Sequence, residues 1–224
     1  MTETPTIRSY WPTVLFGVLL VLPVVLLARG QTPGPREMFS RAEADFRAGR
    51  LEQSVDGFDQ VARALPDAAP GFWQRGIALY YVGRFEDCRR QFESHLTVNP
   101  NDVENAAWHF LCVARAESPE AALEALLPVG PDRRAPMAEI YEMFAGRMTP
   151  QDVLSAAGGR PLARFYAHLY RGLYHEALGR PEAAREEIFL AADDQYASVG
   201  GYMYSVAAVH RDLLLQARQG PAQE

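Results

Sequence analysis

The most conspicuous absence from this chain of 224 residues is lysine, so that all 22 of its basic residues are arginine. Acidic residues outnumber them, and the resulting net charge of −6 argues against nucleic acid as a partner, because basic surfaces bind phosphate backbones. The sequence also lacks a phosphate-binding glycine loop, a nucleophile elbow and an HExxH zinc motif. We therefore expect no catalytic residue, no metal and no cofactor.

Cysteine is almost absent. Cys88 and Cys112 are the two that occur, which excludes a scaffold dense in disulfides and offers no zinc-binding spacing. Both fall inside predicted helices, at positions that we expect to be buried. They are interpreted either as small core residues, since free cysteine is commonly buried, or as one disulfide joining neighbouring repeats in an oxidising compartment.

Charged residues are also absent from residues 9–28, which read SYWPTVLFGVLLVLPVVLLA. A helix of this length would span about 30 Å, the thickness of the hydrocarbon core of a bilayer. Residues 1–30 are interpreted either as a transmembrane anchor or as a signal peptide cleaved before Gln31, because Ala28 and Gly30 fit the small-residue rule for cleavage. In both cases we expect residues 31–224 on the extracytoplasmic side, anchored to the membrane or free in the periplasm.

What is present is an internal repeat of 34 residues, clearest when residues 69–102 are compared with residues 35–68. Each unit has a small residue that lets two helices approach, a glycine that turns the chain between them, and a proline that ends the second helix. The matched positions are Ala42 and Gly76, Gly49 and Gly83, Ser54 and Cys88, Phe58 and Phe92, and Pro66 and Pro100.

This period is typical of the tetratricopeptide repeat, a helix–turn–helix unit that stacks into a solenoid. The predicted fold class is therefore all-α, with no sheet. Ser118-Pro119 and Thr149-Pro150 are predicted to begin helices, with the hydroxyl residue as N-cap and proline at the first helical position. The predicted units are repeats 35–68 and 69–102, a degenerate repeat 103–136, a short helical pair 137–158, a repeat 165–198 and a capping helix 200–218.

Helix A of each repeat is expected to line a concave groove. By repeat register, the exposed groove positions in the first two units include Phe39, Phe46, Trp73, Ile77 and Tyr80. Aromatic rings there would give a partner peptide a large contact area. The alternative is that several of these rings pack inside the array or under the cap.

Other clusters have structural as well as functional interpretations. His168 and His175 lie seven residues apart on one predicted helix, about 10 Å along its axis, which is too far for one metal ion. With Glu176 they form the enzymatic alternative, as acid–base groups. A tyrosine series is interpreted as half-buried packing or as a recognition stripe, and two arginine pairs are expected to be solvated. These are Tyr166, Tyr170 and Tyr174, and Arg89-Arg90 and Arg133-Arg134.

Several irregular blocks also occur in a particular order. RGIALYYVGR (75–84), NPND (99–102), WHFL (108–111), a short helix at 140–146 and the stretch 165–192 together resemble the NlpI family of bacterial envelope tetratricopeptide lipoproteins. The resemblance implies an adaptor that faces outward from a membrane, forms homodimers and holds a periplasmic protease near peptidoglycan hydrolases. The chain departs from the family pattern because no lipid-bearing cysteine follows the apolar segment.

The sequence therefore predicts a non-enzymatic adaptor or scaffold of the cell envelope that captures partner peptides in an aromatic groove. Residues 9–28 would provide the membrane link, and a second surface, with the terminal helix as the candidate, would serve self-association. The alternative within the same class is a generic membrane-associated assembly scaffold with no protease involved.

Overall fold

Consecutive helices pack against one another throughout the part of the chain that the structure describes. The computed structural model describes residues 1–2 and 33–219, and residues 33–219 belong to one compact unit. Helices are the only regular secondary structure in these residues, so the all-α prediction is confirmed there. The helices are α1 (Pro35–Arg47), α2 (Leu51–Ala64), η1 (Ala69–Gly71), α3 (Trp73–Tyr81), α4 (Phe85–His95), α5 (Val103–Ala116), α6 (Pro119–Glu124), α7 (Met137–Phe144), α8 (Pro150–Ala157), α9 (Pro161–Ala177), α10 (Pro181–Ala191), η2 (Asp194–Tyr196) and α11 (Gly201–Gln219).

The turns within the repeats use the glycines that the 34-residue period picks out. Gly49, Gly83 and Gly179 have φ angles of 72°, 76° and 66°, a left-handed conformation that costs glycine little because it has no Cβ. Helix starts follow the predicted signals as well. The Ser118 side chain accepts from the backbone N–H of Ala121, and Thr149 forms a reciprocal capping box with Asp152.

The small residue of helix A allows a close approach of helix B. A Cβ added at Gly76 would lie 2.7 Å from the Phe92 ring, closer than atoms pack in proteins. In the first unit, Ser54 stands at the position that corresponds to Cys88, and its hydroxyl donates to the carbonyl of Ala42 over 2.8 Å. The repeat signature therefore corresponds to direct contacts between α1 and α2 and between α3 and α4.

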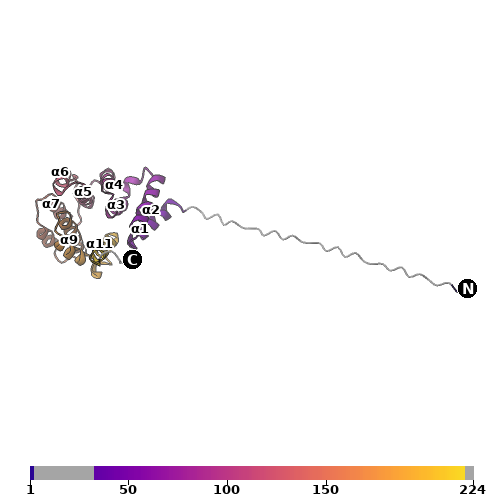
Figure 1. Ribbon diagram of the computed structural model, residues 1–224. Helices are drawn as coiled ribbons and strands as arrows, with labels where there is room; N and C mark the ends of the chain where they lie inside the picture. The colour runs from indigo at the N-terminus through magenta and orange to yellow at the C-terminus, as the bar shows by residue number, and fades with distance from the viewer. Residues whose placement is uncertain (3–32, 220–224) are drawn as a thin grey trace. The chain divides into compact units, whose positions relative to one another are not determined.

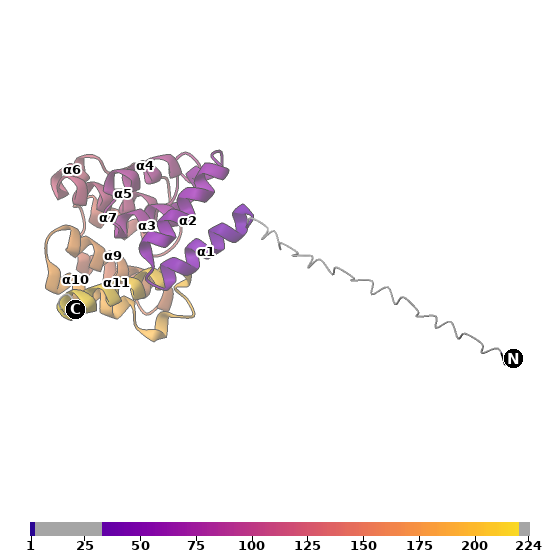
Figure 2. The same ribbon diagram turned by 45° about the vertical axis from the view of Figure 1, so that its right-hand side comes forward.

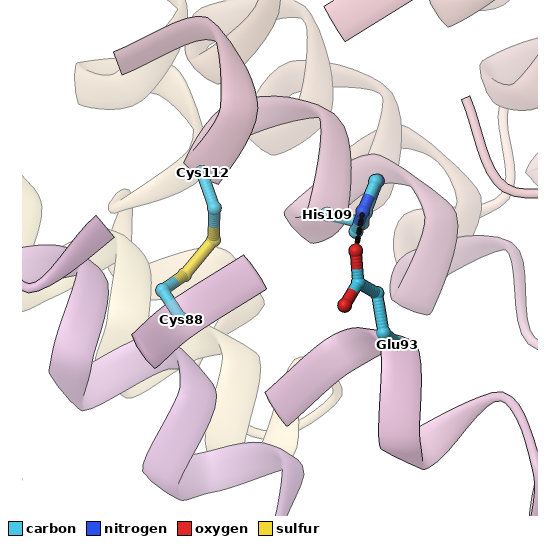
Figure 3. Close-up of a disulfide and its surroundings, with 4 residues drawn as sticks. All are labelled: Cys88, Glu93, His109 and Cys112. Carbon is cyan, nitrogen blue, oxygen red and sulfur yellow. Dashed lines mark hydrogen bonds and ion pairs between the residues drawn. A yellow bond between two sulfur atoms is a disulfide. The ribbon is translucent and has the colours of Figure 1, made fainter. Parts of the chain in front are cut away.

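A disulfide joins α4 to α5. Cys88 and Cys112 are buried and covalently bonded, with their Cα atoms 5.9 Å apart (Figure 3). The disulfide is therefore the interpretation that holds. On the same helix pair, the His109 ring lies 3.5 Å from the Glu93 carboxylate, as the dashed line in Figure 3 marks. This interface links the second repeat to the degenerate third unit.

The helices follow an arc from α1 through α5 to α9, and α11 closes the arc by returning to α1 (Figures 1 and 2). The predicted cap does pack on α10, but it also contacts α1 across the inner side of the arc. Its role differs from the expected one because Tyr202, near its start, lies against aromatic rings of α1 and α3. The helix thus covers part of the inner face as well as the end of the array.

The predicted membrane segment, residues 9–28, lies outside the described residues, as does the proposed cleavage point before Gln31. Among residues 33–219, no helix combines the length and the apolar character that a bilayer crossing requires.

Candidate functional site

The inner face is partly filled, which changes the status of the five predicted groove residues. Phe46, Ile77 and Tyr80 are buried, so the expectation that they are exposed is wrong. Phe39 and Trp73 are half-buried. For Phe46 and Trp73 the physical reason is α11, because the Tyr202 ring stacks on Phe46 at 5.7 Å and meets Trp73 edge-on at 5.2 Å, as centroid distances. Tyr80 instead packs edge-on against Phe85 and Trp108 of the neighbouring helices.

Beside this contact, the inner face retains a cavity of about 360 Å³, which we call the inner cavity. Its walls come from α3, α4, α5, α9 and the start of α11. Two predicted groove residues, Trp73 and Ile77, lie in its wall. The full lining is Trp73, Ile77, Phe92, His95, Asp102, Glu104, Asn105, Trp108, Arg134, Leu162, Tyr166, Val199, Gly200, Gly201, Tyr202 and Met203.

Several buried polar groups of this lining have no hydrogen-bond partner among residues 33–219. Asn105 is 1% exposed, and both its amide oxygen and its amide nitrogen are unpartnered. The indole N–H of Trp108, the Nε2 of His95 and the hydroxyl of Tyr202 are in the same condition. Buried polar atoms are nearly always paired in proteins, so four such residues around one cavity make its lining the candidate site.

The charged side chains of the lining form one network. The Arg134 guanidinium donates to Asp102 and Asp132 over 2.6 Å each, and also donates to Glu104. The hydroxyl of Tyr170 donates to the second oxygen of Glu104 over 2.6 Å. Arg134 was expected to be solvated. Its side chain is 44% exposed, but three carboxylates hold it at the edge of the cavity.

The pKa values of this network reflect burial and pairing. Burial raises the pKa of the Glu104 carboxyl, although Arg134 opposes the shift. Burial would also raise the pKa of Asp132, but its hydrogen bonds to Arg134 hold that pKa below its usual range. The cavity therefore has a fixed acidic side, with a buried carboxyl that a cation would help to ionise.

The rest of the inner face is closed by a different set of polar contacts. The Tyr81 hydroxyl lies 3.0 Å from Nδ1 of His210 on α11, and Nε2 of the same ring lies 3.2 Å from Glu176 on α9. Arg115 of α5 donates to Glu176 over 3.3 Å. Here polar side chains of α3, α5, α9 and α11 lie close to one another, although Oε2 of Glu176 and the Tyr80 hydroxyl make no hydrogen bond among residues 33–219.

The remaining candidates, apart from Tyr166, lie outside the lining of the inner cavity. His168 is buried between α9 and α10, with Nδ1 2.7 Å from Glu187, whereas His175 is half-buried. Tyr170 is buried and Tyr174 half-buried, while Tyr166 lies in the cavity wall. The tyrosine series is therefore divided between packing and the inner face.

Sequence reasoning missed the residues that define the cavity chemistry. Asn105 offered one signal, because it is a lone amide within the apolar stretch of helix A in the third unit. Trp108 appeared only as part of a resemblance block. Arg134 and Asp132 lie in the connection between α6 and α7, where no periodic pattern operates.

The fold and the site together fit a helical repeat protein of the tetratricopeptide type. No family model matches the chain. A DnaJ protein P58IPK homolog of Arabidopsis thaliana is 25% identical over 85 residues, which are 38% of this chain. The match covers 18% of that relative, so the chain spans only a small part of its length. The activity and the partners of this chain are therefore matters for proposal.

Proposed function

We propose that this protein is a non-enzymatic adaptor that binds partner proteins at the inner cavity. The observation that carries the proposal is the set of unpartnered buried polar groups around Asn105, within an aromatic wall. Concave surfaces of repeat arrays serve as binding faces, and a few polar groups among aromatic rings fix the orientation of a ligand. The weak similarity to a tetratricopeptide protein supports protein partners in general.

The proposed location is the extracytoplasmic side of a membrane, in the cell envelope. Two observations support it: the Cys88–Cys112 disulfide, since disulfides persist in oxidising compartments, and the uncharged run of residues 9–28. The sequence resemblance to the NlpI family supports the finer proposal. In that proposal the partners are a periplasmic protease and peptidoglycan hydrolases, and the protein forms a homodimer.

A generic assembly scaffold is the second candidate within this class, and it requires no protease. The enzymatic alternative has weaker support, because neither His168 nor His175 lines the inner cavity. His168 instead pairs with Glu187, which also binds Arg171 over 2.9 Å, so its ring is engaged in packing α9 on α10.

The test uses two surface leucines of equal exposure. Leu162 is 42% exposed at the rim of the inner cavity, and Leu190 is 41% exposed on α10, away from it. The full-length chain and the variants Leu162→Glu and Leu190→Glu are used to capture proteins from envelope extract, and each captured protein is purified and retested alone. We expect Leu162→Glu to lose the partners and Leu190→Glu to keep them. Equal capture by both variants would refute the assignment of the cavity.

The compartment is tested separately, in cells. Thiol alkylation of the freshly isolated protein, unfolded in denaturant, should leave Cys88 and Cys112 unmodified until a reductant is added, because both are buried in the folded chain. The mass of the mature chain distinguishes the anchor from the signal peptide, because a chain that starts at Gln31 has been cleaved. Free thiols at both cysteines in freshly isolated protein would count against the envelope.

A further inference from the structure

We propose that the inner cavity binds the free amino end of a peptide, with its ammonium group beside Glu104 and its first peptide unit on Asn105 and Trp108. This proposal rests on the proposed function and specifies which part of a partner enters the cavity. It follows from three properties of the lining: the sign of its charge, the kinds of hydrogen-bonding atoms left unpartnered, and its size.

The charge of the lining favours a cation. Asp102 and Glu104 oppose a single guanidinium, that of Arg134, and a third carboxylate, Asp132, shares the same guanidinium. An anionic ligand would meet excess negative charge in a partly buried site, where charges are screened less than in bulk water. An ammonium would complement this negative charge. The rings of Trp73, Trp108 and Tyr202 in the lining would contact the ammonium and the apolar groups next to it.

The unpartnered atoms include donors as well as acceptors. His95 donates through Nδ1 to the carbonyl of Pro70 over 2.9 Å, because a carbonyl only accepts, and its Nε2 lies 3.9 Å from the Asp102 carboxylate without a hydrogen bond. Asn105 offers one acceptor and one donor group, and the Trp108 indole is a donor only. A bare alkylammonium uses acceptors alone and a carboxylate uses donors alone. An ammonium followed by a peptide unit uses both.

The size of the inner cavity favours a chain end. At about 360 Å³ it lies near the lower limit of ordinary ligand pockets, so it accommodates a terminal residue and its first peptide unit rather than a long segment. Leu162 and Val199 lie at its rim and are exposed, which leaves an apolar entrance where the following residues of a partner would rest. The terminal side chain would lie among the aromatic rings.

The test titrates the full-length chain with leucyl-alanyl-alanine amide and with its N-acetylated form. Two of the three tryptophans, Trp73 and Trp108, line the inner cavity, so intrinsic fluorescence reports the binding. We expect the free-amine peptide to bind saturably with a Kd of about 1 mM, and the acetylated peptide to bind about tenfold more weakly or worse. Butylamine, which represents a lysine side chain, should bind at least about tenfold more weakly than the free-amine peptide.

Variants place the interaction within the cavity. Glu104→Gln and Asn105→Leu should each weaken binding of the free-amine peptide by about tenfold. Glu93→Gln is the matched control, since it makes the same carboxylate-to-amide change on α4 outside the cavity lining, and it should bind like the unaltered protein. Circular dichroism checks that each variant is folded.

Three outcomes would overturn this inference: equal binding of the free and acetylated peptides, no saturable binding up to about 10 mM, or binding of butylamine as tight as that of the peptide. These outcomes differ from failure of the adaptor function. If Leu162→Glu abolishes capture of a partner but acetylation has no effect, the adaptor stands and the amino-end specificity falls. If the free-amine peptide binds but no partner is captured, the adaptor falls.

Discussion

The inner face of this helical array treats its buried polar groups in two opposite ways. Where α11 closes the face, the Tyr81 hydroxyl lies 3.0 Å from His210, whose other nitrogen lies 3.2 Å from Glu176. In the inner cavity, the Asn105 amide and the Trp108 indole have no partner among the described residues. The first set stabilises the closed array, while the second costs free energy in the unbound protein. The two sets therefore contribute to the stability of the unbound protein with opposite sign, although the Tyr80 hydroxyl near the first set is unpartnered as well.

The largest expected effect tests whether α11 covers Phe46 on the inner face. Phe46→Ala should lower the free energy of unfolding by about 4 kcal/mol, because the ring is completely buried and stacks on Tyr202. Urea unfolding measures the change. Phe39→Ala is the matched control on the same helix. Its ring is only half-buried, against Phe58 and Phe72, and should cost less.

A different result would change the comparison. If Phe46→Ala lowered the stability by less than about 1 kcal/mol, Phe46 would be restored to an exposed groove position, and α11 would not be its cover. In that case both ends of the inner face would be open to partners.

The next prediction compares the two kinds of polar group directly. Tyr81→Phe should destabilise the protein by about 1 kcal/mol, because it removes a hydroxyl that His210 binds. Asn105→Leu should stabilise it by about 1 kcal/mol, because it removes a buried amide that has no partner and adds apolar contact. Thermal and urea unfolding of the two variants should therefore move in opposite directions.

The control for this pair is the neighbouring tyrosine. Tyr80 is buried as well, but its hydroxyl has no hydrogen-bond partner among residues 33–219. Tyr80→Phe should therefore change the stability in the same direction as Asn105→Leu, and not in the direction of Tyr81→Phe. If Asn105→Leu proved destabilising, the amide would have a partner in the folded protein, and the contrast between the two ends would disappear.

Most of the helical array could be predicted because its signals are local and periodic. Gly49 and Gly83 mark turns by their positive φ, and Ser118 and Thr149 cap helices within three residues. These effects depend only on neighbouring backbone, so a single sequence reveals them. One boundary differed: α9 begins at Pro161, four residues before the predicted unit 165–198, because proline there starts a helix.

The candidate site was less predictable because long-range contacts define it. Repeat register placed Phe46 on helix A, but no local pattern indicates that a helix beginning at Gly201 will cover it. The pairing of Arg134 with Asp102 depends on how the connection between α6 and α7 folds back onto α5. Such contacts join residues roughly thirty or more positions apart, beyond the reach of periodicity.

The smallest expected effect is a pH dependence of the stability that arises from His210, in the part of the inner face that α11 closes. Burial lowers the pKa of His210, and nearby Arg115 lowers it further, while Glu176 opposes the shift. In the unfolded chain His210 therefore binds a proton at about pH 6.5, whereas in the folded chain it binds one only at lower pH. The free energy of unfolding should fall as the pH drops below about 6.5. Unfolding at about pH 7.5 and about pH 5.5 measures this loss.

His210→Gln should reduce that loss. It should not abolish it, because burial also lowers the pKa values of His109 and His175, which act with the same sign. An equal acid loss in His210→Gln and the unaltered protein would mean that His210 is protonated without cost in the folded state. The closed end would then be as accessible to water as the inner cavity, and the two ends would differ only in their hydrogen bonds.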